Sequence, residues 1–101
     1  MPKRKPALRH EDTGKYAELS LRANPDGLVL VFSPSLAALL SIAEREKRKP
    51  LTKTEVNRIK DSAPAIAVTS EQAAALVEDR GYEDVDPQRA FDNWQEMNEE
   101  T

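Results

Sequence analysis

The sequence contains no cysteine, a single histidine and only three glycines among its 101 residues. The lack of cysteine excludes disulfides, thiolate metal ligands and a cysteine nucleophile, and it is compatible with a reducing compartment. With so few glycines, the chain also lacks a glycine-rich loop that would cradle a phosphate group. These absences remove several kinds of catalytic and ligand-binding site.

The scarcity of histidine weakens the case for catalysis further. His10 lies close to the N-terminus, so no serine has a histidine base in the part of the chain expected to fold. The nearest approach to a metal site is the cluster Glu83, Asp84 and Asp86, which lacks the glycine and the distant bidentate glutamate of an EF-hand loop. We therefore expect no catalytic residue, no metal site and no cofactor, and we do not expect an enzyme.

Long apolar runs are missing as well. No segment approaches the ~20 apolar residues that span a bilayer. The basic start MPKRKP is not followed by the apolar stretch of a secretory signal. We expect a cytoplasmic protein without a membrane partner.

The net charge of −3 conceals a separation of charge along the chain. Residues 1–60 carry 13 Lys and Arg against 7 Asp and Glu, a balance of +6. Residues 61–101 carry 2 against 11, a balance of −9. Such asymmetry indicates either a charged partner or weak attraction between the two parts of the surface.

The length is typical of one domain. Residues 1–14 hold two prolines and four basic side chains without apolar periodicity, which predicts a flexible basic arm. We expect residues 15–98 to form the domain and residues 99–101 to fray.

The first part of this domain has the pattern of a β-hairpin. Apolar and polar residues alternate over 16–22, and residues 28–32 form an apolar run, so each segment is predicted to be a strand. Between them, Pro25 and Gly27 suit a type I turn followed by a left-handed glycine. The apolar run at 65–68 is either a third strand beside 28–32 or a buried connector, because periodicity does not separate the two.

Four helices are predicted after the hairpin. The first is expected to be capped by Ser33, with Pro34 at its first position, and to end before Pro50. The second begins with a capping box of Thr52 and Glu55 and ends before residue 64. The fold is therefore predicted to be α+β, with an antiparallel hairpin packed against about four helices.

The other two helices meet at residues 80–87, RGYEDVDP. The third helix is expected to begin at Thr69 or Ser70 and to end at Gly81, with residues 73, 74, 76 and 77 inward. The fourth is expected to be capped by Asp86. Its face of Phe91, Trp94 and Met97 is either the core-facing stripe, which we favour, or part of an interface.

The leading functional prediction is a non-enzymatic protein-interaction module that offers an acidic surface, residues 70–100, to a basic partner. Immunity proteins and antitoxins that neutralise basic nucleases are one version of this prediction. Charged residues would supply steering, and two aromatic residues would supply anchors. The predicted partner-binding residues are Glu78, Asp79, Tyr82, Glu83, Asp84, Asp92, Trp94 and Glu96. Within this set, Glu83 and Asp84 have no structural role that the sequence reveals.

Two alternatives remain. One is a nucleic-acid-binding accessory protein that uses the arm and a basic patch to contact phosphates. That patch would comprise Arg45, Lys47, Arg48, Lys49, Lys53, Arg58 and Lys60. The other is a homo-oligomeric structural subunit that buries the hairpin edge or the aromatic stripe against a second copy.

Two segments carry a sequence signature, LTKTEVNRIKD at 51–61 and RGYEDVDP at 80–87, followed by Trp94 and Gln95. The signature resembles that of a family of small uncharacterised bacterial proteins and covers about half of the chain. The resemblance implies a bacterial origin, and it implies no particular activity.

Overall fold

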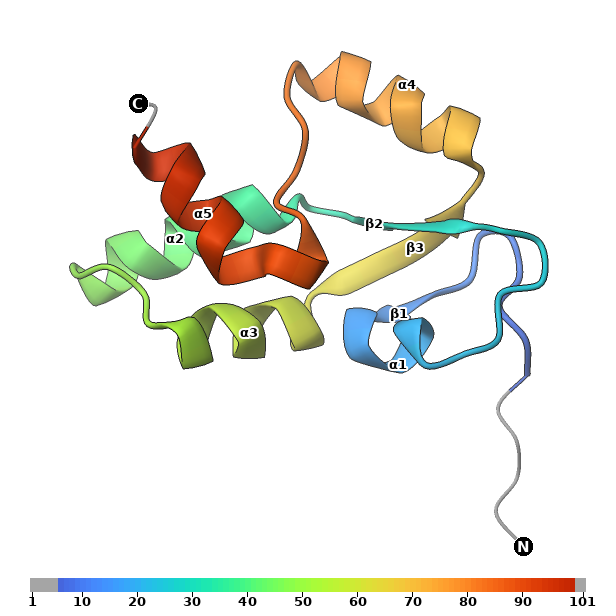
Figure 1. Ribbon diagram of the computed structural model, residues 1–101, viewed down its shortest axis with the longest axis horizontal. Helices are drawn as coiled ribbons and strands as arrows, with labels where there is room; N and C mark the ends of the chain where they lie inside the picture. The colour runs from blue at the N-terminus through green and yellow to red at the C-terminus, as the bar shows by residue number, and fades with distance from the viewer. Residues whose placement is uncertain (1–5, 100–101) are drawn as a thin grey trace, which may run out of the picture.

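The computed structural model describes residues 6–99 and confirms the α+β class (Figure 1). The elements, in chain order, are β1 (Thr13–Lys15), α1 (Tyr16–Ser20), β2 (Val29–Phe32), α2 (Leu36–Lys47), α3 (Lys53–Ser62), β3 (Pro64–Val68), α4 (Ser70–Arg80), the 3-10 turn η1 (Pro87–Arg89) and α5 (Ala90–Glu99). None of the helices in this described part has the length and apolarity needed to cross a membrane.

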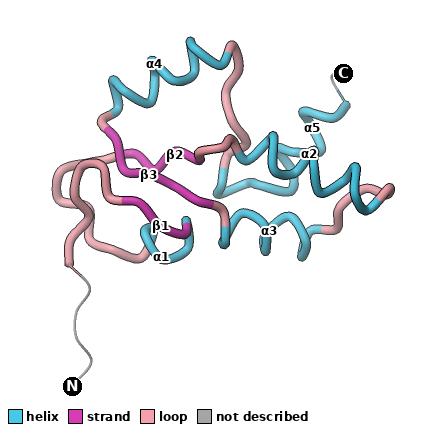
Figure 2. Tube along the Cα trace, turned by 180° about the vertical axis from the view of Figure 1, so that it is seen from behind, coloured by secondary structure: helices cyan, strands magenta, loops and turns pink. Residues whose placement is uncertain are grey.

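The three strands form one antiparallel sheet in the order β1-β3-β2 (Figure 2). The run at 65–68 is thus a strand, and it is the central one. Ile66 lies opposite Thr13 of β1 on one side and Val31 of β2 on the other. Ala65 and Ala67 of β3 are buried, so the middle of the sheet is built from small side chains.

The predicted hairpin between 16–22 and 28–32 is wrong, because most of its first segment is helix α1. A strand with alternating apolar and polar residues buries every second side chain against one face of a sheet. Within 16–22 only Leu19 is buried, whereas Leu21 is 80% exposed. The position beside β2 is taken by β3 instead. The turn itself does form: Gly27 has a φ of +64° and donates its N–H to the Asn24 carbonyl at 3.3 Å. It joins α1 to β2.

The predicted arm is also wrong for residues 6–14, which belong to the fold. The Leu8 side chain is 2% exposed, and its N–H donates to the Ala23 carbonyl at 2.8 Å. Ala67 of β3 bonds through its N–H to Asp12 and through its carbonyl to Glu11. Sheet pairing thus begins before β1. Residues 1–5 and 100–101 lie outside the described residues, and the backbone of residue 99 closes α5.

The main part of the core lies where α2, α3 and α5 pack together at one end of the sheet (Figure 1). Leu36, Leu40 and Val56 are each 0% exposed. Trp94 is 4% exposed in the same cluster, which confirms the favoured interpretation of the aromatic stripe. Burying large apolar side chains from three helices and the sheet supplies most of the driving force for folding such a domain.

Local signals placed most helix ends correctly. The capping box of α3 is present: Glu55 N–H donates to Thr52 Oγ1 at 3.2 Å, and the Glu55 carboxylate accepts the Thr52 N–H at 2.9 Å. Thr69 caps α4 in the same way, and Gly81 ends it at a φ of +80°. The start of α2 differs, since Ser35 rather than Ser33 is the cap. The helix also ends earlier than predicted, at Lys47.

We predict that Leu40→Ala lowers the free energy of unfolding by about 2–5 kcal/mol, because it removes buried methyl groups and leaves a cavity. Ile42→Ala is the matched control on the same helix, since Ile42 is 49% exposed. The control is expected to change stability by no more than about 0.5 kcal/mol. Urea unfolding of the two variants measures both values, and equal losses would contradict this account of the core.

A second prediction concerns Glu55. Lys47 and the Thr52 N–H lower the pKa of this carboxyl group from 4.5 to about 2. Because the pKa is depressed in the folded state, ionised Glu55 stabilises the fold above about pH 4.5, and this contribution is lost as the pH falls toward 2. Urea unfolding between about pH 2 and about pH 7 should show a stability difference between wild type and Glu55→Gln that shrinks with acidification. Glu46→Gln, on an exposed α2 side chain, should follow the wild-type curve; a Glu55→Gln difference independent of pH would refute the prediction.

Candidate functional site

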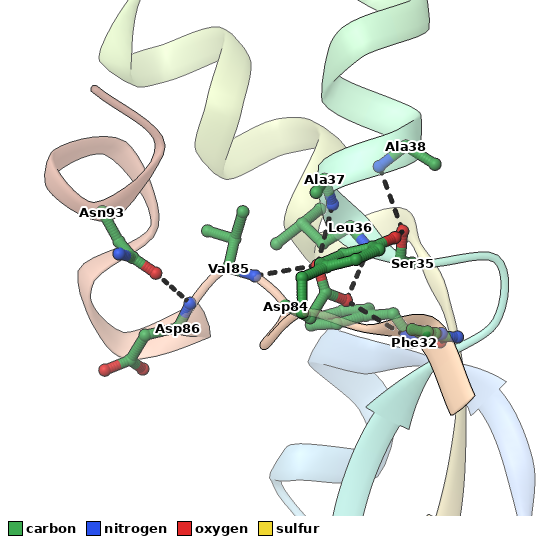
Figure 3. Close-up of polar contacts among 11 residues, drawn as sticks. Phe32, Ser35, Leu36, Ala37, Ala38, Asp84, Val85, Asp86 and Asn93 are labelled. Carbon is green, nitrogen blue, oxygen red and sulfur yellow. Dashed lines mark hydrogen bonds and ion pairs between the residues drawn. The ribbon is translucent and has the colours of Figure 1, made fainter. Parts of the chain in front are cut away.

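The linker from α4 to η1 is attached to the start of α2 through Asp84 (Figure 3). One carboxylate oxygen of Asp84 accepts the N–H of Leu36 at 2.7 Å, and the other accepts the N–H of Ala37 at 2.8 Å. The second oxygen also accepts the N–H of Val85 at 2.8 Å. The first N–H groups of a helix have no partner within it, and negative charge is favoured there. Asp84 therefore caps α2 from a distant part of the chain.

Two neighbouring side chains strengthen this attachment. The Arg80 guanidinium donates to the Phe32 carbonyl of β2 at 2.7 Å and lies 3.7 Å from Asp84 Oδ2. The Tyr82 hydroxyl is hydrogen-bonded to Ser35 Oγ at 2.8 Å. The end of α4 is thus tied to β2, and the linker to the cap residue of α2, by charged and polar contacts.

A groove of about 380 Å³ lies between α4, β2 and this linker, and we call it the α4 groove. Val29 to Phe32 of β2 form one wall, and Ala73, Leu76 and Val77 of α4 form another. The rest is lined by Arg80 and by residues 82–87. The two walls are apolar, while every charged lining group comes from the stretch 80–87.

The α4 groove exists because α4 is lightly packed. None of its side chains is buried: Ala73, Leu76 and Val77 are partly covered, and Ala74 is exposed, contrary to the prediction that it faces inward. Three successive alanines offer little apolar area to a facing surface. Val29 of β2 consequently remains 36% exposed, and α4 stands apart from the other helices in Figure 1.

The predicted acidic residues fall into two groups. Most are exposed carboxylates on α4, the linker and α5, namely Glu78, Asp79, Glu83, Asp92 and Glu96. Of these, Glu96 accepts a hydrogen bond from Arg89 at 3.0 Å. Asp84 is not free for a partner, because it caps α2, so the expectation that it lacks a structural role is wrong.

The two predicted aromatic anchors differ in their exposure to solvent. Trp94 is buried in the core and presents no surface to a partner. Tyr82 is 40% exposed and lines the α4 groove, while its hydroxyl is held by Ser35. Only Tyr82 therefore lies where an anchor would be needed.

The basic patch lies on a different part of the molecule, over α3, the C-terminal end of α2 and their connection. Lys47 is paired with Glu55, and Lys60 Nζ lies 3.4 Å from Asp61. The remaining cations of the patch are exposed: Arg45, Arg48, Lys49, Lys53 and Arg58. In Figure 1, α4 lies at the top of the molecule and α3 at the bottom, so the acidic helix and the basic patch are well separated.

The sequence did not reveal the groove itself. Arg80 carries no local signal that it would contact Phe32, 48 residues away. The single hint was that three of the five apolar residues of α4 are alanines, which offer little apolar area for packing. Within residues 6–99, no group of three or more His, Asp or Glu side chains is arranged to hold a metal ion.

We predict that Asp84→Ala lowers the free energy of unfolding by about 1–3 kcal/mol, since it leaves two N–H groups of α2 without their acceptor and removes the ion-pair partner of Arg80. Glu83→Ala is the matched control, because the neighbouring Glu83 side chain is exposed and is expected to contribute no more than about 0.5 kcal/mol. Chemical denaturation measures both. Equal stabilities of the two variants would show that Asp84 does not hold the linker to α2.

Comparison with protein-family models, with curated proteins and with solved structures found no match to this chain. The resemblance of residues 51–95 to small bacterial proteins stays a prediction. A functional proposal must therefore rest on the charges and contacts of the site itself.

Proposed function

We propose that this protein is a non-enzymatic interaction module that presents an acidic surface to a basic protein partner. The acidic surface comprises the exposed carboxylates Glu71, Glu78, Asp79, Glu83 and Asp92. One observation carries the proposal. Both cations of the stretch 61–99 are engaged internally, Arg80 with Asp84 and Arg89 with Glu96, whereas the five carboxylates have no cationic partner among the described residues.

Unpaired charge of one sign sets the long-range behaviour of such a surface. It attracts a partner of opposite charge and raises the association rate, and it disfavours acidic competitors. Exposed charges contribute little binding energy by themselves, so affinity depends on the apolar groups that become buried against the partner. Tyr82, partly exposed beside these carboxylates, is an aromatic group in position to supply that binding energy. Inhibition of a basic nuclease, as by an immunity protein or antitoxin, is one activity that this arrangement suits.

A second candidate function is nucleic-acid binding through the basic patch. The observation in its favour is the exposure of Arg45, Arg48, Lys49, Lys53 and Arg58 without ion pairs among the described residues. Phosphate contacts of this kind give binding that is strongly salt-dependent and carries little sequence information. It is the weaker candidate, because no aromatic side chain lies in the patch to stack on a base.

We predict that the double variant Asp79→Lys/Glu83→Lys loses the basic partner that wild type captures from a lysate of the source cells. The expected loss is at least about tenfold, and wild-type capture should weaken as salt is raised. Glu18→Lys/Asp26→Lys changes the net charge equally at exposed positions elsewhere, and it should retain the partner. Unchanged partners and unchanged salt dependence in the first variant would refute the proposal.

A further double variant, Lys49→Glu/Arg58→Glu, separates the acidic surface from the basic patch. Wild type and both charge-reversal variants are mixed with a random DNA duplex at about 50 mM salt. The basic patch is favoured if wild type and Asp79→Lys/Glu83→Lys bind the duplex and Lys49→Glu/Arg58→Glu does not. Light scattering of wild type measures the mass in solution. A stable dimer in place of a captured partner would favour the homo-oligomeric alternative.

A further inference from the structure

We infer that the α4 groove is the specificity pocket of the acidic surface and takes a short extended segment of the partner, in which apolar side chains alternate with Lys or Arg. This inference rests on the proposed function and goes further, because it names the part of the surface that selects the partner and the chemistry of the segment selected. Three properties of the groove carry it: its apolar walls, the charge of its rim and the open backbone edge of β2.

The walls are apolar and incompletely covered. Val29 is 36% exposed, and Val31, Leu76 and Val77 are only partly buried. At about 380 Å³, the groove lies near the lower end of the range for ligand pockets and suits one or two apolar side chains. Filling it would remove these walls from water, which is the energetic role of a central pocket in a protein interface.

The rim carries a net negative charge. Glu83, Asp84 and Asp86 line the groove, and Arg80 is the one lining cation. Arg80 is occupied by the Phe32 carbonyl and by Asp84, and so it offers little to an incoming anion. An acidic segment would meet Glu83 and Asp86, the two lining carboxylates without a cationic partner among the described residues, whereas Lys or Arg would find charge partners there. Charge complementarity therefore selects a basic occupant.

The outer edge of β2 supplies the reason for an extended backbone. In an antiparallel ladder, successive residues direct their N–H and C=O groups alternately to one side and the other. Ser33 donates its N–H to the Pro64 carbonyl at 3.2 Å, toward the central strand. Phe32 and Leu30 must then direct theirs outward, and Arg80 meets the Phe32 carbonyl at 2.7 Å on that side.

The backbone groups of Leu30 consequently lie on the edge of β2 that no other strand of the described sheet covers. An exposed strand edge is a template for pairing with a second chain. Segments that bind in this way gain affinity from main-chain hydrogen bonds and specificity from alternate side chains in pockets. The alternation of apolar and basic residues in the proposed segment follows from this geometry, since one set of side chains enters the groove and the other meets the rim.

Three capped synthetic peptides test the inference by NMR titration of the intact wild-type protein. Lys-Leu-Lys-Val-Lys has the proposed chemistry, Lys-Ser-Lys-Thr-Lys keeps only the charge, and Glu-Leu-Glu-Val-Glu keeps only the apolar side chains. The first is expected to shift the backbone amides of residues 29–32 and 73–77 and to bind at least about tenfold more tightly than the other two. Amides of α3, which does not line the groove, serve as the internal reference.

The variant Ala73→Phe gives a second test, since residue 73 lines the groove and a larger side chain there would fill it. The variant should bind Lys-Leu-Lys-Val-Lys no more tightly than Lys-Ser-Lys-Thr-Lys. Its α3 amide signals should match those of wild type, which shows that the fold is retained. If the two basic peptides bind wild type equally well, or shift only amides near Asp79 and Glu83, the groove inference fails while the acidic surface stands. If neither basic peptide binds and charge reversal leaves partner capture unchanged, both proposals fail.

Discussion

The contact of Asp84 with the first turn of α2 is the interaction on which the arrangement of the second half of the chain depends. Its carboxylate satisfies the N–H groups of Leu36 and Ala37 and lies beside Arg80, which in turn bonds the end of β2 at Phe32. A charged acceptor at a helix N-terminus is among the stronger polar contacts in a folded protein. It joins the sheet, α2 and the α4 linker at one point.

This attachment explains why α4 holds its position with so little packing of its own. None of its side chains is buried, so the hydrophobic effect holds it only weakly. Its ends are fixed instead, by Thr69 directly after β3 and by Arg80 at the tied linker. A helix fixed at its ends and lightly packed between them leaves a groove beside the sheet, and the same linker places carboxylates around it. The fold and the candidate site thus share one cause.

Short-range features of the fold were predictable from sequence. The capping box of α3, the stop at Gly81 and the cap at Asp86 each depend on residues within a few positions of one another, and each is present. The predicted hairpin failed because alternation in 16–22 describes one segment alone, while strand pairing depends on competition among segments. Buried alanines let β3 take the centre of the sheet, and Leu8 drew the N-terminal segment into the core.

The sequence by itself determined the α+β class, the separation of basic and acidic halves, and most helix ends, because composition and local hydrogen bonding require no long-range information. Only the tertiary structure decided which carboxylates are free and which are structural. Glu83 and Asp84 are adjacent acids with the same local signal, yet one is exposed and the other caps a helix 48 residues away. The difference arises from the direction in which each side chain points once α2 is in place, and that direction is fixed by packing.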